Sequence, residues 1–528
     1  MKAINFLILS GLWFLFTFSP TNAQYTNVKI NKANNQPEEV TIAINPANPL
    51  NIAAGANLNN YYYSFDGGKS WNEGTLTSTF GVWGDPSVAF DADGSLFYAH
   101  LSAPPSPGYW IDRIVVNKST DGGKTWDQGT GVGFNPPRKN QDKEWIISDQ
   151  TSSKFRKNLY MSWTQFDRYA STLLQDSSRI MFSRSTDGGL NWSVPIVISD
   201  SSGDCRDSSN TVEGAVPAVG PDGEVYISWS GPSGIKFDKS LDGGLTFGKD
   251  VYAASQPGGW DMDIQGIDRC NGMPVTVCDV SSSKYRGNIY INWADQRNGY
   301  GNTDVFITRS TDGGASWSKA LKVNGTSLLD RDQFFTWAAV DPVNGHIWIV
   351  YYDRSQTAGA ATDVFLSHST DGGESFSSFK ISESSFVPDS TVFFGDYTNV
   401  AAFNGKVYPI WMRMDNRQLS ILTALIDEGS TGLKSGGSLT PGKYYLFQNY
   451  PNPFNPSTTI EYSLADAGYA RIIVYDTLGK IISVIEEGYQ APGRHSVQFN
   501  SKGLSSGMYY YRLITGNFSD SKKMILFK

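Results

Sequence analysis

Short strand-like runs of apolar and aromatic residues recur along the chain, and turns rich in glycine, proline and aspartate separate them. Examples are residues 87–90 followed by 96–99, and residues 337–340 followed by 347–350. Long runs with the helical period are hard to find. The 53 Gly, 24 Pro, 15 Trp, 27 Tyr and 29 Phe are turn formers and residues that favour pleated strands. This pattern predicts an all-β protein.

One octapeptide, Ser-x-Asp-x-Gly-x-x-Trp/Phe, recurs six times at intervals of 55 to 70 residues. Each copy lies between two strand-like runs, so we expect it to form a hairpin turn. The aspartate can accept hydrogen bonds from amides of its own loop, while the glycines take positive φ. We therefore expect a structural role, with catalysis or calcium binding as the alternative. The aspartates are Asp66, Asp121, Asp187, Asp242, Asp312 and Asp371.

A second pair of strands precedes each octapeptide, so each repeat reads as a four-stranded unit. A further unit at 399–426 has three strands and no octapeptide, and residues 25–30 are expected to supply its missing strand. Such a closure joins the ring and removes two unpaired sheet edges. The octapeptide is similar to the Asp box of sialidase-like propellers. We predict a propeller over 24–428, with seven blades or, alternatively, six.

The N-terminus carries Lys2, an apolar run over 4–18 and the sequence Thr21-Asn22-Ala23. This is typical of a signal peptide, which we expect over 1–23, and an uncleaved membrane anchor is the alternative. No later run is long enough to predict a membrane span in the mature protein. The formal net charge of −8 argues against a nucleic-acid partner.

The chain has three cysteines. Cys270 and Cys278 flank a short loop, and we expect a local disulfide bond between them because exported proteins meet oxidising conditions. Cys205 would then be the odd thiol, more often buried than reactive in such a position.

The composition changes over 429–443, which is rich in Gly, Ser and Thr and reads as a linker. The domain at 444–528 opens with Gln448-Asn449-Tyr450-Pro451-Asn452-Pro453-Phe454-Asn455-Pro456 and continues as short strands, so we expect a small immunoglobulin-like β-sandwich. It resembles the type A sorting domain of the type IX secretion system. The resemblance implies export through the periplasm to the outer-membrane surface or the medium, with the secretion machinery as partner. A generic carbohydrate-binding or fibronectin-like module is the alternative.

The loops that enter the innermost strands of a propeller share one face with the loops between the second and third strands, opposite the Asp boxes. Sialidases use an arginine clamp, a tyrosine nucleophile supported by glutamate, and an aspartic acid. By this resemblance Glu213 would support Tyr352, or Tyr351, and Asp85 would donate a proton. Arg297 and Arg354 would hold the substrate carboxylate.

No arginine precedes Arg113, so the third arginine of that pattern is missing or displaced. The alternative for Arg297 and Arg354 is that they are braces paired with Asp295 and Asp353. The leading hypothesis is a secreted exo-glycosidase, of the exo-alpha-sialidase type, acting on acidic or complex extracellular glycans or glycoproteins. A non-catalytic propeller that binds glycan or protein is the alternative, and a structural surface-layer component is a third. The sequence predicts no cofactor and no metal site.

Overall fold

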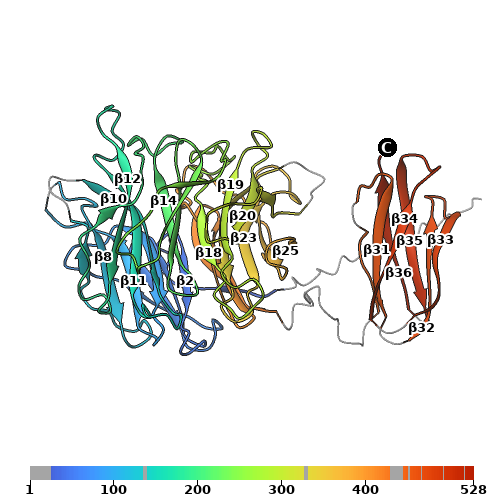
Figure 1. Ribbon diagram of the computed structural model, residues 1–528, viewed down its shortest axis with the longest axis horizontal. Coiled ribbons are helices and arrows are strands. Elements are labelled where there is room, and N and C mark those ends of the chain that lie inside the picture. The colour runs from blue at the N-terminus through green and yellow to red at the C-terminus, as the bar shows by residue number, and fades with distance from the viewer. Residues whose placement is uncertain are drawn as a thin grey trace, which may run out of the picture. The chain divides into compact units, whose positions relative to one another are not determined.

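The computed structural model describes residues 25–106, 108–134, 139–325, 331–428, 444–449, 452–464, 467–490, 493–516 and 518–528. The chain divides into two compact units, Met1–Asp427 and Glu428–Lys528. The expected signal peptide, 1–23, and linker, 429–443, lie outside the described residues. Within the described residues every regular element is a strand, so the all-β prediction is confirmed (Figure 1). No helix in this part of the chain is long and apolar enough to cross a membrane.

The first unit holds six four-stranded sheets and one five-stranded sheet, all antiparallel. The four-stranded sheets are β2 (Thr41–Ile44), β3 (Ile52–Ala56), β4 (Asn60–Ser64) and β5 (Asn72–Thr75); β6 (Gly84–Phe90), β7 (Leu96–Leu101), β8 (Ile114–Ser119) and β9 (Thr130–Val132); β10 (Asn140–Ser148), β11 (Leu159–Phe166), β12 (Ser178–Ser185) and β13 (Ile196–Val197); β14 (Glu213–Val219), β15 (Val225–Ser230), β16 (Ile235–Ser240) and β17 (Val251–Ala254); β18 (Val275–Cys278), β19 (Ile289–Asp295), β20 (Asp304–Ser310) and β21 (Leu321–Lys322); and β22 (Gln333–Val340), β23 (Ile347–Asp353), β24 (Asp363–Ser369) and β25 (Ser377–Lys380).

The N-terminal strand completes the last sheet of this unit. That sheet contains β26 (Asn399–Phe403), β27 (Lys406–Asp415), β28 (Gln418–Ala424) and β29 (Ile426–Asp427), and β1 (Asn27–Lys29) pairs with β28. The expectation that residues 25–30 supply the missing strand is therefore confirmed. The innermost strands β2, β6, β10, β14, β18, β22 and β26 each contact the next, and β26 contacts β2, so they form a closed ring.

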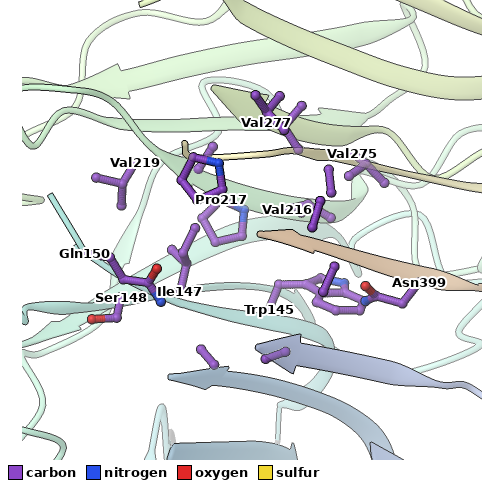
Figure 2. Close-up of a pocket in the computed structure, with 18 of the residues that line it drawn as sticks. Trp145, Ile147, Ser148, Gln150, Val216, Pro217, Val219, Val275, Val277 and Asn399 are labelled. Atoms are coloured by element: carbon purple, nitrogen blue, oxygen red, sulfur yellow. The ribbon is translucent and has the colours of Figure 1, made fainter. Parts of the chain in front are cut away.

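The innermost strands line a central cavity of about 300 Å³. Its walls are mostly small or apolar side chains such as Val216, Val275 and Val277, which converge from neighbouring sheets (Figure 2). Three aromatic rings pack against one another across this ring of strands. The Trp145 and Trp337 centroids are 4.2 Å apart, and Tyr397 lies 5.3 Å from Trp145. Because Trp145 lies in β10, Trp337 in β22 and Tyr397 just before β26, their packing ties three sheets together.

The Asp boxes form the turns between the third and fourth strands of their sheets, as predicted. In the first box Asp66 accepts hydrogen bonds from the Ser70 N–H at 3.0 Å and the Ser70 hydroxyl at 2.6 Å. Gly67 and Gly68 have φ of 72° and 78°. Asp121, Asp187, Asp242, Asp312 and Asp371 make the equivalent contacts within their own loops. The six aspartates therefore stabilise hairpin turns.

The second unit is a two-sheet sandwich, as predicted. One sheet joins β30 (Tyr445–Leu446), β31 (Ser457–Leu464) and β34 (Gly493–Asn500), and the other joins β33 (Ile481–Gln490), β32 (Gly468–Tyr475), β35 (Gly507–Thr515) and β36 (Phe518–Leu526). The opening segment of this unit packs onto the other strands. The Tyr511 hydroxyl donates to the Phe447 carbonyl and accepts from the Asn449 N–H, both at 2.7 Å. The Ile525 N–H donates to the Asn452 side chain at 2.8 Å.

The predicted disulfide bond is wrong, because Cys205, Cys270 and Cys278 are all free and buried. Cys270 belongs to the largest hydrophobic cluster and pairs through its backbone with Met262. Cys278 ends β18 and belongs to a different cluster. The loop between them runs into a strand that separates the two thiols, so nearness in sequence does not bring them together.

Candidate functional site

The chain bends sharply where several innermost strands begin. Glu39, Asp85, Lys143 and Phe335 adopt φ of 52°, 51°, 52° and 47°. The pairing of β6, β10, β14 and β22 with their neighbouring strands shifts register at the same place. Residues other than glycine rarely take such φ values, and strain of this kind is often found at functional sites. These bulges direct polar side chains towards the ring's opening opposite the Asp boxes.

Nine charged residues gather at this opening, and we call them the rim cluster. They are Glu39, Asp85, Asp142, Lys143, Glu144, Asp207, Glu213, Arg269 and Asp396. They come from the openings of six different sheets. The cluster therefore holds seven carboxyl groups and two cations.

Lys143 is the buried cation of the cluster. Its ammonium contacts the Asp396 carboxylate, and it lies 3.5 Å from Asp85 Oδ2 and 3.7 Å from Glu39 Oε1. Burial would lower the pKa of Lys143, but Asp396, Asp85 and Glu39 raise it well above its ordinary value. A permanently charged lysine thus compensates several buried carboxylates.

Arg269 is the cation that reaches solvent, with 40% of its side chain exposed. It donates to Asp396 at 2.8 and 2.5 Å and to Asp207 at 3.3 Å. Burial opposes ionisation of Asp396, but Lys143 and Arg269 hold its pKa well below the ordinary value. Asp207 also accepts hydrogen bonds from the Tyr169 hydroxyl and from Trp260 Nε1, both at 2.8 Å. Asp396 and Asp207 are therefore strongly solvated by protein donors.

Glu213 has the opposite environment. It is completely buried, and neither of its carboxyl oxygens receives a hydrogen bond. The carboxyl group of Asp207 is a near neighbour, and its negative charge opposes ionisation of Glu213. Burial, followed by the charges of Asp207 and Asp142, raises the pKa of Glu213 well above its ordinary value. Its environment therefore favours the protonated form of Glu213.

A small cavity of about 40 Å³ opens next to these groups. It is lined by Asp207, Trp260, Asp261, Arg269, Cys270, Asn271 and Asp396. Asp207 thus stands between the cavity and the buried Glu213.

The structure places Asp85 in the cluster but does not fit the proton-donor role expected for it. Burial would raise its pKa, yet the Lys143 ammonium and hydrogen bonds from Glu39 and Asp142 hold it below the ordinary value. Burial raises the pKa of Glu39 and of Asp142 well above their ordinary values. The lowered pKa of Asp85 therefore opposes its expected role as a proton donor.

Tyr352 lies in the hydrophobic core, away from the rim cluster. It is completely buried, and its hydroxyl bonds to the Met412 backbone, donating at 2.8 Å and accepting at 3.0 Å. Its ring packs against Phe334 and Phe394. Tyr351 is equally buried. Neither tyrosine can meet a substrate. The expectation that one of them is the nucleophile is therefore wrong, and both are core residues.

Arg297 is a brace, and Arg354 is buried without the expected ion pair to Asp353. Arg297 donates to Asp295 at 2.9 and 2.5 Å and to the Ser255 carbonyl at 2.9 Å, and its guanidinium covers Phe306 at 4.1 Å. Arg354 is buried, donates to Thr362 at 3.0 Å and lies over Phe334. Burial lowers the pKa of Arg354 to about 10. The brace alternative is confirmed for the pair Arg297 and Asp295, whereas Asp353 bonds to Ser355.

Glu39, Tyr169, Asp207 and Arg269 were not singled out from the sequence. Glu39 lies two residues before Thr41, where the pairing of β2 begins, and Asp85 lies two residues before Ser87, where the pairing of β6 resumes after its register shift. This shared position could have identified Glu39. Asp207 and Arg269 lie in long loops without a motif. Only the folded ring brings these loops together.

Two family models match parts of the chain. A secretion system C-terminal sorting domain spans residues 448–527, and a BNR/Asp-box repeat spans residues 62–73. The chain therefore carries a sorting domain that directs it through the type IX system to the cell surface or the medium, as predicted. No curated protein matches the chain.

Several solved structures are similar to the first unit at low identity. A Hadza microbial sialidase is 15% identical, with 73% of this chain and 75% of that chain covered at a TM-score of 0.41. An α-L-arabinofuranosidase from Fusarium graminearum is 12% identical, with 77% and 99% covered at 0.43. The NanB sialidase from Streptococcus pneumoniae is 9% identical, with 72% and 84% covered at 0.42. The activities in these names belong to those proteins.

Proposed function

We propose that the protein is a secreted glycosidase-like propeller that acts on extracellular glycans at the rim cluster. The observation that carries this proposal is the contrast between neighbouring carboxyl groups. Glu213 is buried without a hydrogen-bond donor, while Asp207 and Asp396 are held by Arg269 and other donors. Two carboxyl groups whose environments separate their protonation states are the requirement for acid and base catalysis at a glycosidic bond.

In this proposal Glu213 supplies the proton for acid catalysis, and Asp207 carries that proton to the cavity. Asp207 is a near neighbour of Glu213, and Asp207 lines the cavity while Glu213 does not. A proton can pass from Glu213 to Asp207 and on to the glycosidic oxygen of a bound sugar. Asp396, kept ionised by Lys143 and Arg269, would stabilise positive charge that develops at the sugar carbon. Water would then bond to that carbon as the protonated sugar alcohol leaves, and the proton that this water releases would restore the acid.

The charges of the cluster favour a neutral sugar over an anionic one. Both cations are already paired: Lys143 is buried against Asp396, and Arg269, the one that reaches solvent, is bound to Asp396 and Asp207. A substrate carboxylate would have to displace one of these. The cluster therefore supports glycans with hydroxyl groups as the ligand class and argues against the arginine-clamped acidic sugar expected from the sequence.

A binding protein without catalysis is the second candidate. The small cavity and the complete burial of Glu213 favour it. Buried titrating clusters also occur as purely structural networks.

Hydrolysis of a panel of fluorogenic glycosides, together with glycan-array binding, tests the proposal. We expect wild type to hydrolyse a neutral glycoside, and Glu213→Gln or Asp207→Asn to lower kcat by about 10²–10⁴-fold. Asp263→Asn is the control, because Asp263 is exposed, accepts a hydrogen bond from the exposed Tyr300 and is not part of the rim cluster. Glycan binding without hydrolysis by wild type would make the protein a glycan-binding propeller. The absence of both binding and hydrolysis would overturn the proposal.

A further inference from the structure

Two tryptophans and a tyrosine form an exposed row beside the rim cluster. Trp83 and Trp110 are 43% and 40% exposed, and Tyr169 is half-buried. The rings of Trp83 and Trp110 meet edge to face with centroids 5.6 Å apart, and Trp110 meets Tyr169 in the same way at 5.7 Å. Large aromatic side chains are normally buried, so an exposed contiguous set indicates a ligand surface.

Three separate loops hold these rings in place. Trp83 precedes β6 and bonds through its N–H to the Leu101 carbonyl at 2.9 Å. Trp110 lies in the β7–β8 loop and Tyr169 in the β11–β12 loop. Asn140 joins them, because its side chain donates to the Trp110 carbonyl at 3.2 Å and accepts from the Tyr169 N–H at 3.0 Å. The row is therefore built before any ligand arrives, which limits the entropy cost of binding.

The row is continuous with the rim cluster. The Tyr169 hydroxyl donates to Asp207 at 2.8 Å, and Asp207 lines the small cavity. One end of the row thus lies at the carboxylates, while the other end, at Trp83, extends over the neighbouring sheet. A ligand that lies along the row would bring its end to Asp207.

We propose that Trp83, Trp110 and Tyr169 are binding subsites for an extended, uncharged oligosaccharide whose terminal unit reaches the rim cluster. This inference rests on the proposed function and specifies its substrate as a chain and not a single sugar. The C–H faces of sugar rings pack on aromatic rings, while their hydroxyl groups donate to carboxylates, so both halves of the surface suit one ligand. An apolar protein segment would suit the rings but not the carboxylates.

Chain-length dependence tests the inference. The glycan array first identifies the neutral glycan that binds most strongly. This glycan and its shorter homologues, from one to six sugar units, are then titrated into the full-length mature protein by calorimetry. We expect affinity to rise with length in wild type. Trp83→Ala and Trp110→Ala should each lower the affinity for the longest chain roughly tenfold, with little effect on the single sugar.

Phe65→Ala is the matched control, because Phe65 is an exposed aromatic residue of an Asp box on the opposite face. Trp110→Phe keeps a ring and should retain most of the affinity, which separates lost stacking from misfolding. Unchanged affinity in both alanine variants, while Asp207→Asn loses binding, would overturn the aromatic row and leave the proposed function standing. Absence of any neutral glycan binding by wild type would overturn both.

Discussion

The hydroxyl of Tyr352 donates to the carbonyl oxygen of Met412 at 2.8 Å and accepts a hydrogen bond from its N–H at 3.0 Å. This one side chain joins the sheet of β23 to the sheet of β27. The bond explains why a tyrosine stands at a position where a phenylalanine would otherwise fill the core. It also removes the hydroxyl from any role in catalysis.

Tyr352→Phe should therefore destabilise the first unit by roughly 1–2 kcal/mol, because Met412 loses a partner in a buried site. Urea unfolding measures the loss, and ligand affinity should stay at the wild-type value. Loss of binding or turnover with unchanged stability would return Tyr352 to the functional site.

Asp121→Ala should lower stability by about 1 kcal/mol, since it removes the acceptor of the Lys124 and Thr125 amides in an exposed turn. Thermal melting of the protein is the measurement. The rim cluster is on the other face, so glycan binding and hydrolysis should not change. A variant that melts normally but no longer binds ligand would assign a direct role to the Asp boxes.

The three cysteines should titrate as free thiols. Because Cys205, Cys270 and Cys278 are buried, a thiol reagent should label none rapidly in the native protein and all three after denaturation without reductant. Labelling of a single thiol in the denatured protein would restore the disulfide bond between Cys270 and Cys278.

Deletion of residues 440–528 should leave a folded first unit in the periplasm, because the sorting domain directs export across the outer membrane. Cell fractionation and immunoblotting locate the protein. Tyr511→Phe removes the two hydrogen bonds that the Tyr511 hydroxyl makes to Phe447 and Asn449 of the opening segment, and it should reduce secretion. Tyr510→Phe, at an exposed position on the same strand, is the control. Normal secretion of the truncated chain would contradict this role.

Glu213 should make the folded state less stable as pH rises. Its pKa is raised in the folded state, so the protonated form is favoured there. The contribution of Glu213 to the free energy of unfolding is complete at pH values below its ordinary pKa of 4.5, and it is lost as pH rises through the raised pKa. Urea unfolding at pH 5 and pH 9 should show a smaller fall in stability for Glu213→Gln than for wild type.

Asp396 has a lowered pKa and so affects stability in the opposite sense. Its contribution to the free energy of unfolding is lost as pH falls through the lowered pKa. Glu374→Gln, at an exposed site, should behave as wild type. If stability falls equally between pH 5 and pH 9 in Glu213→Gln and in wild type, Glu213 ionises freely in the folded protein.

The fold was largely predictable because its signals are local and repeated. A turn such as Ser64 to Trp71 needs its acceptor aspartate and its two glycines within one loop, so the chemistry is visible in eight adjacent residues. The strand at 27–29 was predictable because the last sheet lacked one strand. The sorting segment around Asn449 was recognisable because its many prolines and asparagines form a long continuous string.

The site was not predictable in the same way, because its partners are far apart in the chain. Lys143 and Asp396 are 253 residues apart, and Arg269 and Asp396 are 127 apart. Arg297 and Asp295 are two residues apart, and their local spacing correctly suggested a brace. Whether Glu213 is protonated depends on burial and on Asp207, which only packing provides. The sequence by itself determined the strands, the turns and the export domain, since each depends on neighbours along the chain. The tertiary structure alone decided which carboxylates meet, because ring closure sets those distances and the burial that fixes their charge.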